Sequence, residues 1–293
     1  MGKLLDDYNK RTVNFIGFKF ERKTFFTTIA IALGVLAVFI ILSVCGVGIS
    51  WYGVLLGMGF LVALALAPQM FKENGIKEDY AYTVVWWIFP LAIIGARAYF
   101  MIFDSSTYEF LDFFKIWQGG LAVFGGIIGG ALGLVLSCLV SKVSIIKTTD
   151  AVAPLLSLGQ AFGRIGCIFG HCCYGVEVTN KTLQWFPVAL KIGSEYHYAT
   201  NFYESIFDVI LFFILLTIFR KIKITGITTF SYMVGYGVIR YILESFRDKK
   251  QTLFVGTMPV SQIVSIICVV VGVVGICTLL LVNNKKTKKS NVN

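Results

Sequence analysis

The residues best suited to chemistry stand together at the end of an apolar run, where residues 163–173 include an arginine, a histidine and three cysteines. The arginine is Arg164, which lies well inside the segment 151–169, a stretch hydrophobic enough to sit in lipid. An arginine at that depth costs about 2.5 kcal/mol or more unless it faces a partner, a cavity or a bound anion. A structural ion pair is the simpler explanation, but charge inside a membrane segment usually marks a functional site. We therefore predict an anion-binding role for Arg164.

A second charged set lies in the apolar segment 227–244, where Tyr236, Arg240 and Glu244 are spaced by four residues and so share one helix face. Arg240 and Glu244 could satisfy each other, and that pair alone needs no functional explanation. Two arginines on different helices would nevertheless bind a phosphate strongly, because guanidinium binds it through two hydrogen bonds. A lipid head group is the phosphate most available at that depth. Charged residues of other segments that could balance this set are Glu204, Asp208 and Arg97.

Three cysteines, Cys167, Cys172 and Cys173, leave more than one kind of chemistry open. His171 is close enough in sequence to form a Cys–His nucleophile pair. A disulfide from Cys167 to either of the others is the alternative, since a bond between adjacent cysteines would be strained. Zinc sites usually draw their ligands from separated pairs, and His197 is the only other histidine of the chain. We expect neither a metal nor another cofactor.

The composition identifies lipid as the solvent in which these residues must be positioned. The 293 residues are 57% hydrophobic and only 14% charged, whereas a soluble domain is closer to about 25% charged. Apolar runs near the length that crosses a bilayer predict an all-α polytopic membrane protein of about eight helices with a small extracytoplasmic loop region. The predicted spans are residues 27–47, 51–68, 83–103, 119–140, 151–169, 202–219, 227–244 and 259–282.

The basic residues predict the orientation of these spans. The net charge of +10 does not indicate nucleic-acid binding, because lysines and arginines flank the apolar runs and form no single stripe. Most of them fall on one side, so both termini are expected in the cytoplasm. Residues 1–50 then hold a basic surface segment (1–26) and the first span, residues 51–283 the main membrane domain, and residues 284–293 a basic tail. The turn at Cys172 and the long loop 175–201 would lie outside, with the loop as a small head.

In their order along the chain, these motifs resemble the prolipoprotein diacylglyceryl transferases. The resemblance runs from about residue 51 to the carboxyl terminus and rests on the glycine–arginine motif around Arg164, the Gln118 motif that leads to Gly125 and Gly126, and the set from Tyr236 to Arg247. It implies an enzyme of the bacterial inner membrane that moves diacylglycerol from phosphatidylglycerol to the lipobox cysteine thiol of a lipoprotein precursor and releases glycerol phosphate.

Carried over by position, the resemblance implies roles for individual residues. Arg164 and Arg240 would hold the lipid phosphate, while Tyr236 and Glu244 would line the catalytic cavity. The remaining matched residues would contribute to substrate binding: Gly163, Gly166, Gln118 and Tyr52.

The chain departs from that pattern in several places. Phe124 stands where the family usually has a histidine, and Cys167 and Cys172 stand in place of an asparagine and a glutamate. An extra amino-terminal span precedes the seven-helix family core. His171 is therefore a candidate for the missing base, because a neutral imidazole can take a proton from a thiol near pH 7. The alternative function is a non-catalytic lipid-binding paralogue, or one with a different acceptor.

Overall fold

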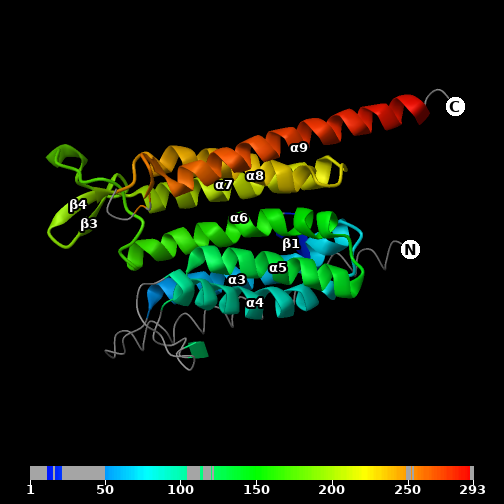
Figure 1. The fold of residues 1–293 in the computed structure, drawn as a ribbon, viewed down its shortest axis with the longest axis horizontal. Coiled ribbons are helices and arrows are strands. Elements are labelled where there is room, and N and C mark those ends of the chain that lie inside the picture. Colours follow the sequence, from blue (N-terminus) through cyan, green and yellow to red (C-terminus); the bar gives the residue numbers. More distant parts are fainter. Residues whose placement is uncertain are drawn as a thin grey trace.

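The computed structural model describes residues 12–15, 17–21, 50–103, 113–114, 120, 122–248, 252 and 254–290. Within these ranges the chain is almost entirely helical, and its long helices lie side by side in two layers (Figure 1). The helices are α3 (Trp51–Glu73), α4 (Tyr80–Phe103), α5 (Val123–Ser141), α6 (Ile145–Phe169), α7 (Thr200–Lys221), α8 (Ile227–Glu244) and α9 (Val260–Ser290).

Six of these helices are long and apolar enough to cross a membrane. The seventh, α8, carries Arg240 and Glu244 and is the shortest at 18 residues. The prediction of an all-α polytopic membrane protein is confirmed. The first predicted span, residues 27–47, lies outside the described residues. At the other end of the chain, α9 continues to Ser290, so the segment predicted as a tail begins within this helix.

Glycines bring α4 and α5 into close contact. A side chain at Gly125 or Gly129 would collide with the backbone of α4 at Gly95 and Leu91, and one at Gly133 would meet the Trp87 carbonyl. These glycines recur every four residues, so they form one face of α5. Because glycines have no side chain, the two backbones can approach closely at this face. Helix packing therefore accounts for the glycine-rich sequence of α5.

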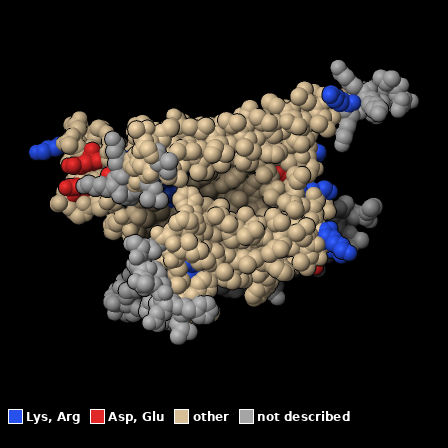
Figure 2. Space-filling view, in the orientation of Figure 1, with Lys and Arg blue, Asp and Glu red and all other residues tan. Residues whose placement is uncertain are grey.

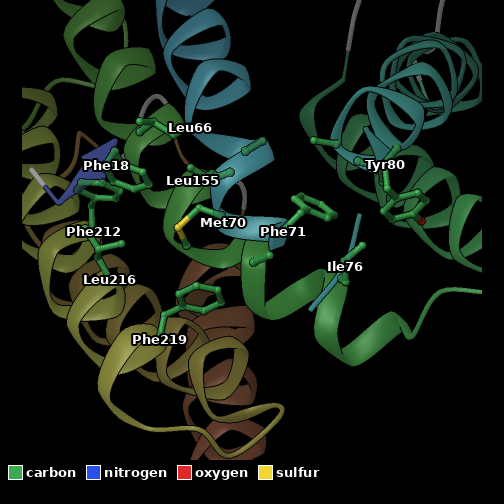
Figure 3. Packing of buried hydrophobic residues seen from close by; sticks show 14 of the residues in the cluster. Phe18, Leu66, Met70, Phe71, Ile76, Tyr80, Leu155, Phe212, Leu216 and Phe219 are labelled. Carbon is green, nitrogen blue, oxygen red and sulfur yellow. The ribbon is translucent and has the colours of Figure 1, made fainter. Parts of the chain in front are cut away.

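The packed core occupies one end of the bundle. Apolar side chains of α3, α4, α6 and α7 meet there, and Figure 3 shows them from close by. Tyr80 is satisfied within this core by the Ser137 hydroxyl, at 3.0 Å. The largest members of the cluster are Phe18, Leu66, Met70, Phe71, Ile76, Tyr80, Leu155, Phe212, Leu216 and Phe219. Arg164 and Arg240 lie near the carboxyl ends of α6 and α8, at the other end of the bundle from this core.

The amino-terminal segment, predicted to lie on the membrane surface, also contacts the helices. It contains an antiparallel hairpin of β1 (Thr12–Phe15) and β2 (Phe18–Glu21). Phe18 is 1% exposed, and the Arg220 guanidinium at the end of α7 lies 4.5 Å from its ring centroid. The same guanidinium pairs with Glu73 at the end of α3. The hairpin therefore packs on protein, because its aromatic residue completes the core.

A small head covers the other end of the bundle. It contains the 3-10 turn η3 (Lys181–Leu183) and the hairpin of β3 (Ala189–Ile192) and β4 (Glu195–Tyr198). Backbone bridges join Gly175 to Arg247 and Glu177 to His197, so the head is tied to the residues that follow α8. Figure 1 shows β3 and β4 at the end opposite the carboxyl end of α9. A second short hairpin, β5 (Phe254–Val255) with β6 (Met258–Pro259), precedes α9.

Candidate functional site

Glu204, near the start of α7, lies between two arginines that come from other helices. One carboxylate oxygen is 2.9 Å from Arg164 of α6, and the other is 3.2 Å from Arg240 of α8. Only 3% of the Glu204 side chain is exposed, against 19% of Arg164 and 13% of Arg240. Three helices therefore meet at one buried carboxylate, which compensates the cost of holding two arginines in lipid.

The charge network continues toward the head of the molecule. Arg240 also contacts Glu244 at 2.8 Å, one turn along the same helix, and Glu244 contacts Arg247 at 3.4 Å. Arg247 donates a hydrogen bond to the Cys173 sulfur at 2.8 Å. Three guanidinium groups thus share two carboxylates and one thiol.

Arg164 keeps donors available for a further anion. A guanidinium carries five N–H donors in a planar fork. Among the described residues, the ion pair with Glu204 is the one polar contact of the Arg164 side chain. This side chain is 19% exposed, more than the side chains of Glu204 and Arg240. Arg240, by contrast, is engaged by both Glu204 and Glu244. Phosphate binding at this point would therefore begin at Arg164.

The thiols of Cys167, Cys172 and Cys173 converge, and their sulfur atoms all lie within 4.8 Å of one another. None of the three is in a disulfide; Cys167 is buried, and the other two are partly exposed. Hydrogen bonds with the Cys167 and Cys172 thiols, together with the Arg247 guanidinium, hold the pKa of the Cys173 thiol well below its usual range. These cysteines are close in the sequence, but no sequence pattern predicts that Arg247 contacts one of them.

Comparison with known proteins gives the family of the chain. Residues 39–278 match the family model of prolipoprotein diacylglyceryl transferase. The chain belongs to this family. A relative from Clostridium perfringens, named phosphatidylglycerol–prolipoprotein diacylglyceryl transferase 1, is 33% identical over 84% of this chain and 95% of its own length. Relatives with the same activity in their names, from Finegoldia magna and Clostridium kluyveri, are 34% and 36% identical, each over 79% of this chain and 92% of their own lengths.

Membership of the prolipoprotein diacylglyceryl transferase family makes the chain a transferase and a multi-pass protein of the bacterial inner membrane. The resemblance inferred from the sequence motifs is thus confirmed. The family match begins at residue 39, inside the first predicted span.

The structure brings most of the other predicted site residues to the same end of this transferase. Tyr236 lies one turn before Arg240 on α8 and stacks on Tyr232, whose hydroxyl donates to Gln160. Tyr52, at the start of α3, packs so closely on Gly166 that a side chain there would lie 3.1 Å from its ring. Gly163 faces Leu56 with ordinary spacing.

His171 and Arg97 are among the predicted residues that do not join the charge network. His171 is exposed, with a left-handed backbone (φ 47°), and its imidazole has no hydrogen-bond or ion-pair partner among the described residues. Arg97 donates to the Gly120 carbonyl at 3.1 Å. Gln118 lies outside the described residues. The role of His171 as a base stays a prediction.

Asp208, one turn beyond Glu204 on α7, is fully buried, and neither of its carboxylate oxygens has a hydrogen-bond partner within the described ranges. Phe124, in the place of the usual family histidine, is half-exposed, and its ring lies 6.4 Å from that of Tyr99. The site therefore contains a buried acid that the ion pairs do not use and lacks an imidazole at the start of α5.

The surface of the molecule is hollowed between the two helix layers. Figure 2 shows a face of the molecule hollowed between the layer that holds α9 and the layer that holds α5, with largely uncharged surface around the hollow. A different pocket, of about 300 Å3, lies at the core end of the bundle among Glu73, Lys147, Asp150 and Lys223. Its lining includes none of the arginines of the site.

Proposed function

We propose that this transferase moves the diacylglyceryl group of phosphatidylglycerol to the cysteine thiol of a lipoprotein precursor. The observation that carries the proposal is the meeting of Arg164 and Arg240 at Glu204. Relatives whose names state this activity cover most of the chain at 33–36% identity. The two guanidiniums would hold the lipid phosphate, with Arg164 as the first contact because it keeps free donors.

The proposed reaction requires stabilisation of the negative charge that develops on the departing phosphate. The acceptor sulfur attacks the glycerol carbon that bears the phosphate, a carbon–sulfur bond forms, and the carbon–oxygen bond breaks. The electron pair stays on the phosphate, so glycerol phosphate departs with one more negative charge than the phosphate had in the lipid. Guanidiniums fixed by Glu204 and Glu244 are aimed at this developing charge, and preorganised donors of this kind stabilise a transition state.

The lipid would enter sideways. Its head group would reach the charge network near the head of the molecule while its acyl chains occupy the hollow between the two helix layers (Figure 2). Tyr52, Tyr236, Gly163 and Gly166 would line the path, since they lie on α3, α6 and α8 around Arg164. In this arrangement the site opens on the extracytoplasmic side and both termini are cytoplasmic, as the distribution of lysines and arginines predicts.

A non-catalytic lipid-binding paralogue is the second candidate function. The observation in its favour is Phe124, an apolar residue packed near Tyr99 where the family usually has a histidine. Such a protein would bind phosphatidylglycerol through Arg164 and release no glycerol phosphate.

One experiment separates the two candidates. Purified protein in detergent receives phosphatidylglycerol and a lipobox peptide, and the peptide mass and glycerol phosphate are followed. Diacylglyceryl peptide that forms with the wild type and disappears in Arg164→Ala supports transfer. Lipid binding that depends on Arg164, without product, supports the paralogue.

A further inference from the structure

The thiol cluster of Cys167, Cys172 and Cys173 has the composition of a soft-metal site. Thiolates are preferred ligands of Zn²⁺ and Cu⁺. Two zinc-bound sulfurs in tetrahedral geometry lie about 3.8 Å apart, as follows from zinc–sulfur bonds of about 2.3 Å. The three sulfurs already lie within 4.8 Å of one another. A small closure of the cluster would therefore bring all of them within bonding distance of one ion.

The loop that carries two of these thiols is built to fold back on α6. Cys173 and His171 both have left-handed backbones, with φ of 61° and 47°. These conformations are uncommon for residues other than glycine. The Cys172 amide donates to the Cys167 carbonyl at 3.1 Å, and the side chains of Thr200 and Asn201 donate to the carbonyls of Cys173 and Cys172. The start of α7 thus holds the loop over Cys167.

The charges around the cluster suit an ion with three thiolates. Three thiolates and Zn²⁺ carry one net negative charge, and Arg247 lies 2.8 Å from the Cys173 sulfur. Arg164 precedes Cys167 by three residues, so the two share one face of α6.

We infer that Cys167, Cys172 and Cys173 bind a zinc ion whose fourth position is open to the thiol of the acceptor cysteine. Three protein ligands with one open position are typical of catalytic zinc. Because Cys172 and Cys173 are partly exposed, one side of the cluster can accept a further ligand. This inference rests on the proposed function. It departs from the sequence-based expectation of no metal, which depended only on the spacing of the cysteines.

The zinc ion would activate the acceptor thiol in place of the family histidine, where this chain has Phe124. On binding, the acceptor thiol loses its proton to water and remains on zinc as a thiolate. Its sulfur then forms the carbon–sulfur bond while the carbon–phosphate oxygen bond breaks, and glycerol phosphate leaves with the electron pair toward Arg164 and Arg240. The product is a neutral thioether, which binds zinc more weakly than a thiolate and can depart.

The binding test uses full-length protein, reduced, stripped with a chelator and titrated with Co²⁺ and then Zn²⁺. We expect one Co²⁺ per chain, with sulfur-to-cobalt charge-transfer bands that Zn²⁺ abolishes. Cys172→Ser should weaken binding by about 100-fold or more, since it removes a ligand without disturbing the buried Cys167. The matched control, Cys268→Ser on α9, should bind as the wild type does. Absence of the bands in reduced wild type, or their full retention in Cys172→Ser, would overturn the inference.

A second measurement tests the open position. Lipobox peptide added to the Co²⁺ protein should shift its visible spectrum, whereas a peptide with serine in place of the cysteine should not. An identical response to both peptides contradicts the inference. The transfer assay separates this result from the proposed function: full transfer by stripped protein, lost in Arg164→Ala, leaves the transferase standing and removes the zinc. A peptide-dependent shift without any transfer would keep the zinc site and remove the proposed reaction.

Discussion

Arg164 and Glu204 form an ion pair of 2.9 Å between α6 and α7, and the same carboxylate reaches Arg240 on α8. A single acidic side chain therefore fixes both arginines that are proposed to hold the lipid phosphate. Glu204 is thus a positioning residue: it compensates the two charges in lipid and sets the directions in which their remaining donors point. The proposed phosphate binding and the meeting of three helices depend on the same group.

Replacement of Glu204 by glutamine should destabilise the protein more than a charge change elsewhere. The variant keeps the shape of the side chain but leaves two largely buried guanidiniums with one fewer counter-ion. Breaking a buried ion pair costs about 3 kcal/mol, which would appear as a lower melting temperature in detergent. Glu73→Gln is the matched control, because its partner Arg220 is more exposed, at 27%. Equal melting temperatures for the two variants would contradict a central role of Glu204.

Arg164→Lys should lose most of the transfer while the fold is retained. Lysine keeps the positive charge but cannot donate two parallel hydrogen bonds from a planar group. Loss of one preorganised donor of this kind lowers turnover by about 100-fold or more. Arg220→Lys, in the ion pair at the core end of the bundle, serves as the control and should transfer nearly as the wild type does. Comparable turnover of Arg164→Lys and the control would remove Arg164 from phosphate binding.

The sequence predicted the helices well because hydrophobic runs and their flanking charges are local signals. Residues 227–244 were predicted and observed as α8 with the same bounds. Arg164, Arg240 and Glu244 were found because charge inside an apolar run is rare. Glu204, which pairs with both arginines, was only one of several possible countercharges in the sequence. Pairing between helices depends on how the helices pack.

Contacts that join distant parts of the chain could not be predicted. The hydrogen bond from Arg247 to Cys173 spans 74 positions and depends on two left-handed residues in the loop. The burial of Phe18 could not be predicted either, because this residue belongs to a short, basic segment. The spacing of the three cysteines likewise did not reveal that their sulfurs converge.

Close packing of α4 on α5 should make neighbouring glycines respond differently to the same change. Gly129→Ala places a methyl group against the Leu91 carbonyl, so the helices must separate and the melting temperature should fall. Gly130→Ala meets side-chain atoms of Ala92 and Ile88 at 3.7 Å, an ordinary contact, and should be nearly neutral. Thermal unfolding of both variants in one detergent makes the comparison. A Gly130 variant as unstable as the Gly129 variant would argue against this interface.

The proposed orientation predicts opposite labelling of two serines. Ser194, in the turn of the head hairpin, and Ser144, just before α6, are both exposed and lie at opposite ends of the bundle. In intact cells that carry Ser194→Cys or Ser144→Cys, a membrane-impermeant maleimide should label the first and reach the second only after permeabilisation. The unmodified chain gives the background from its own cysteines. The reverse pattern would place the charge network on the cytoplasmic side.

Cys173 should behave as a thiolate at a pH where most thiols are protonated. Its pKa lies well below the usual value because of hydrogen bonds with Cys167 and Cys172 and the nearby Arg247 guanidinium. A thiol of ordinary pKa, about 8.5, loses reactivity about tenfold for each pH unit below that value. In reduced, chelator-treated protein, alkylation of Cys173 by iodoacetamide should therefore change little between pH 8 and about pH 6, as followed by peptide mass spectrometry. Arg247→Gln removes a charge that favours the thiolate, so the pKa of Cys173 should rise. The rate near pH 6 should fall once that pKa exceeds about 6, by about tenfold for each further unit. The two proteins should converge again at high pH, where the thiol is ionised in both. A wild-type rate that declines tenfold per unit from pH 8 downward would show that Cys173 is an ordinary thiol.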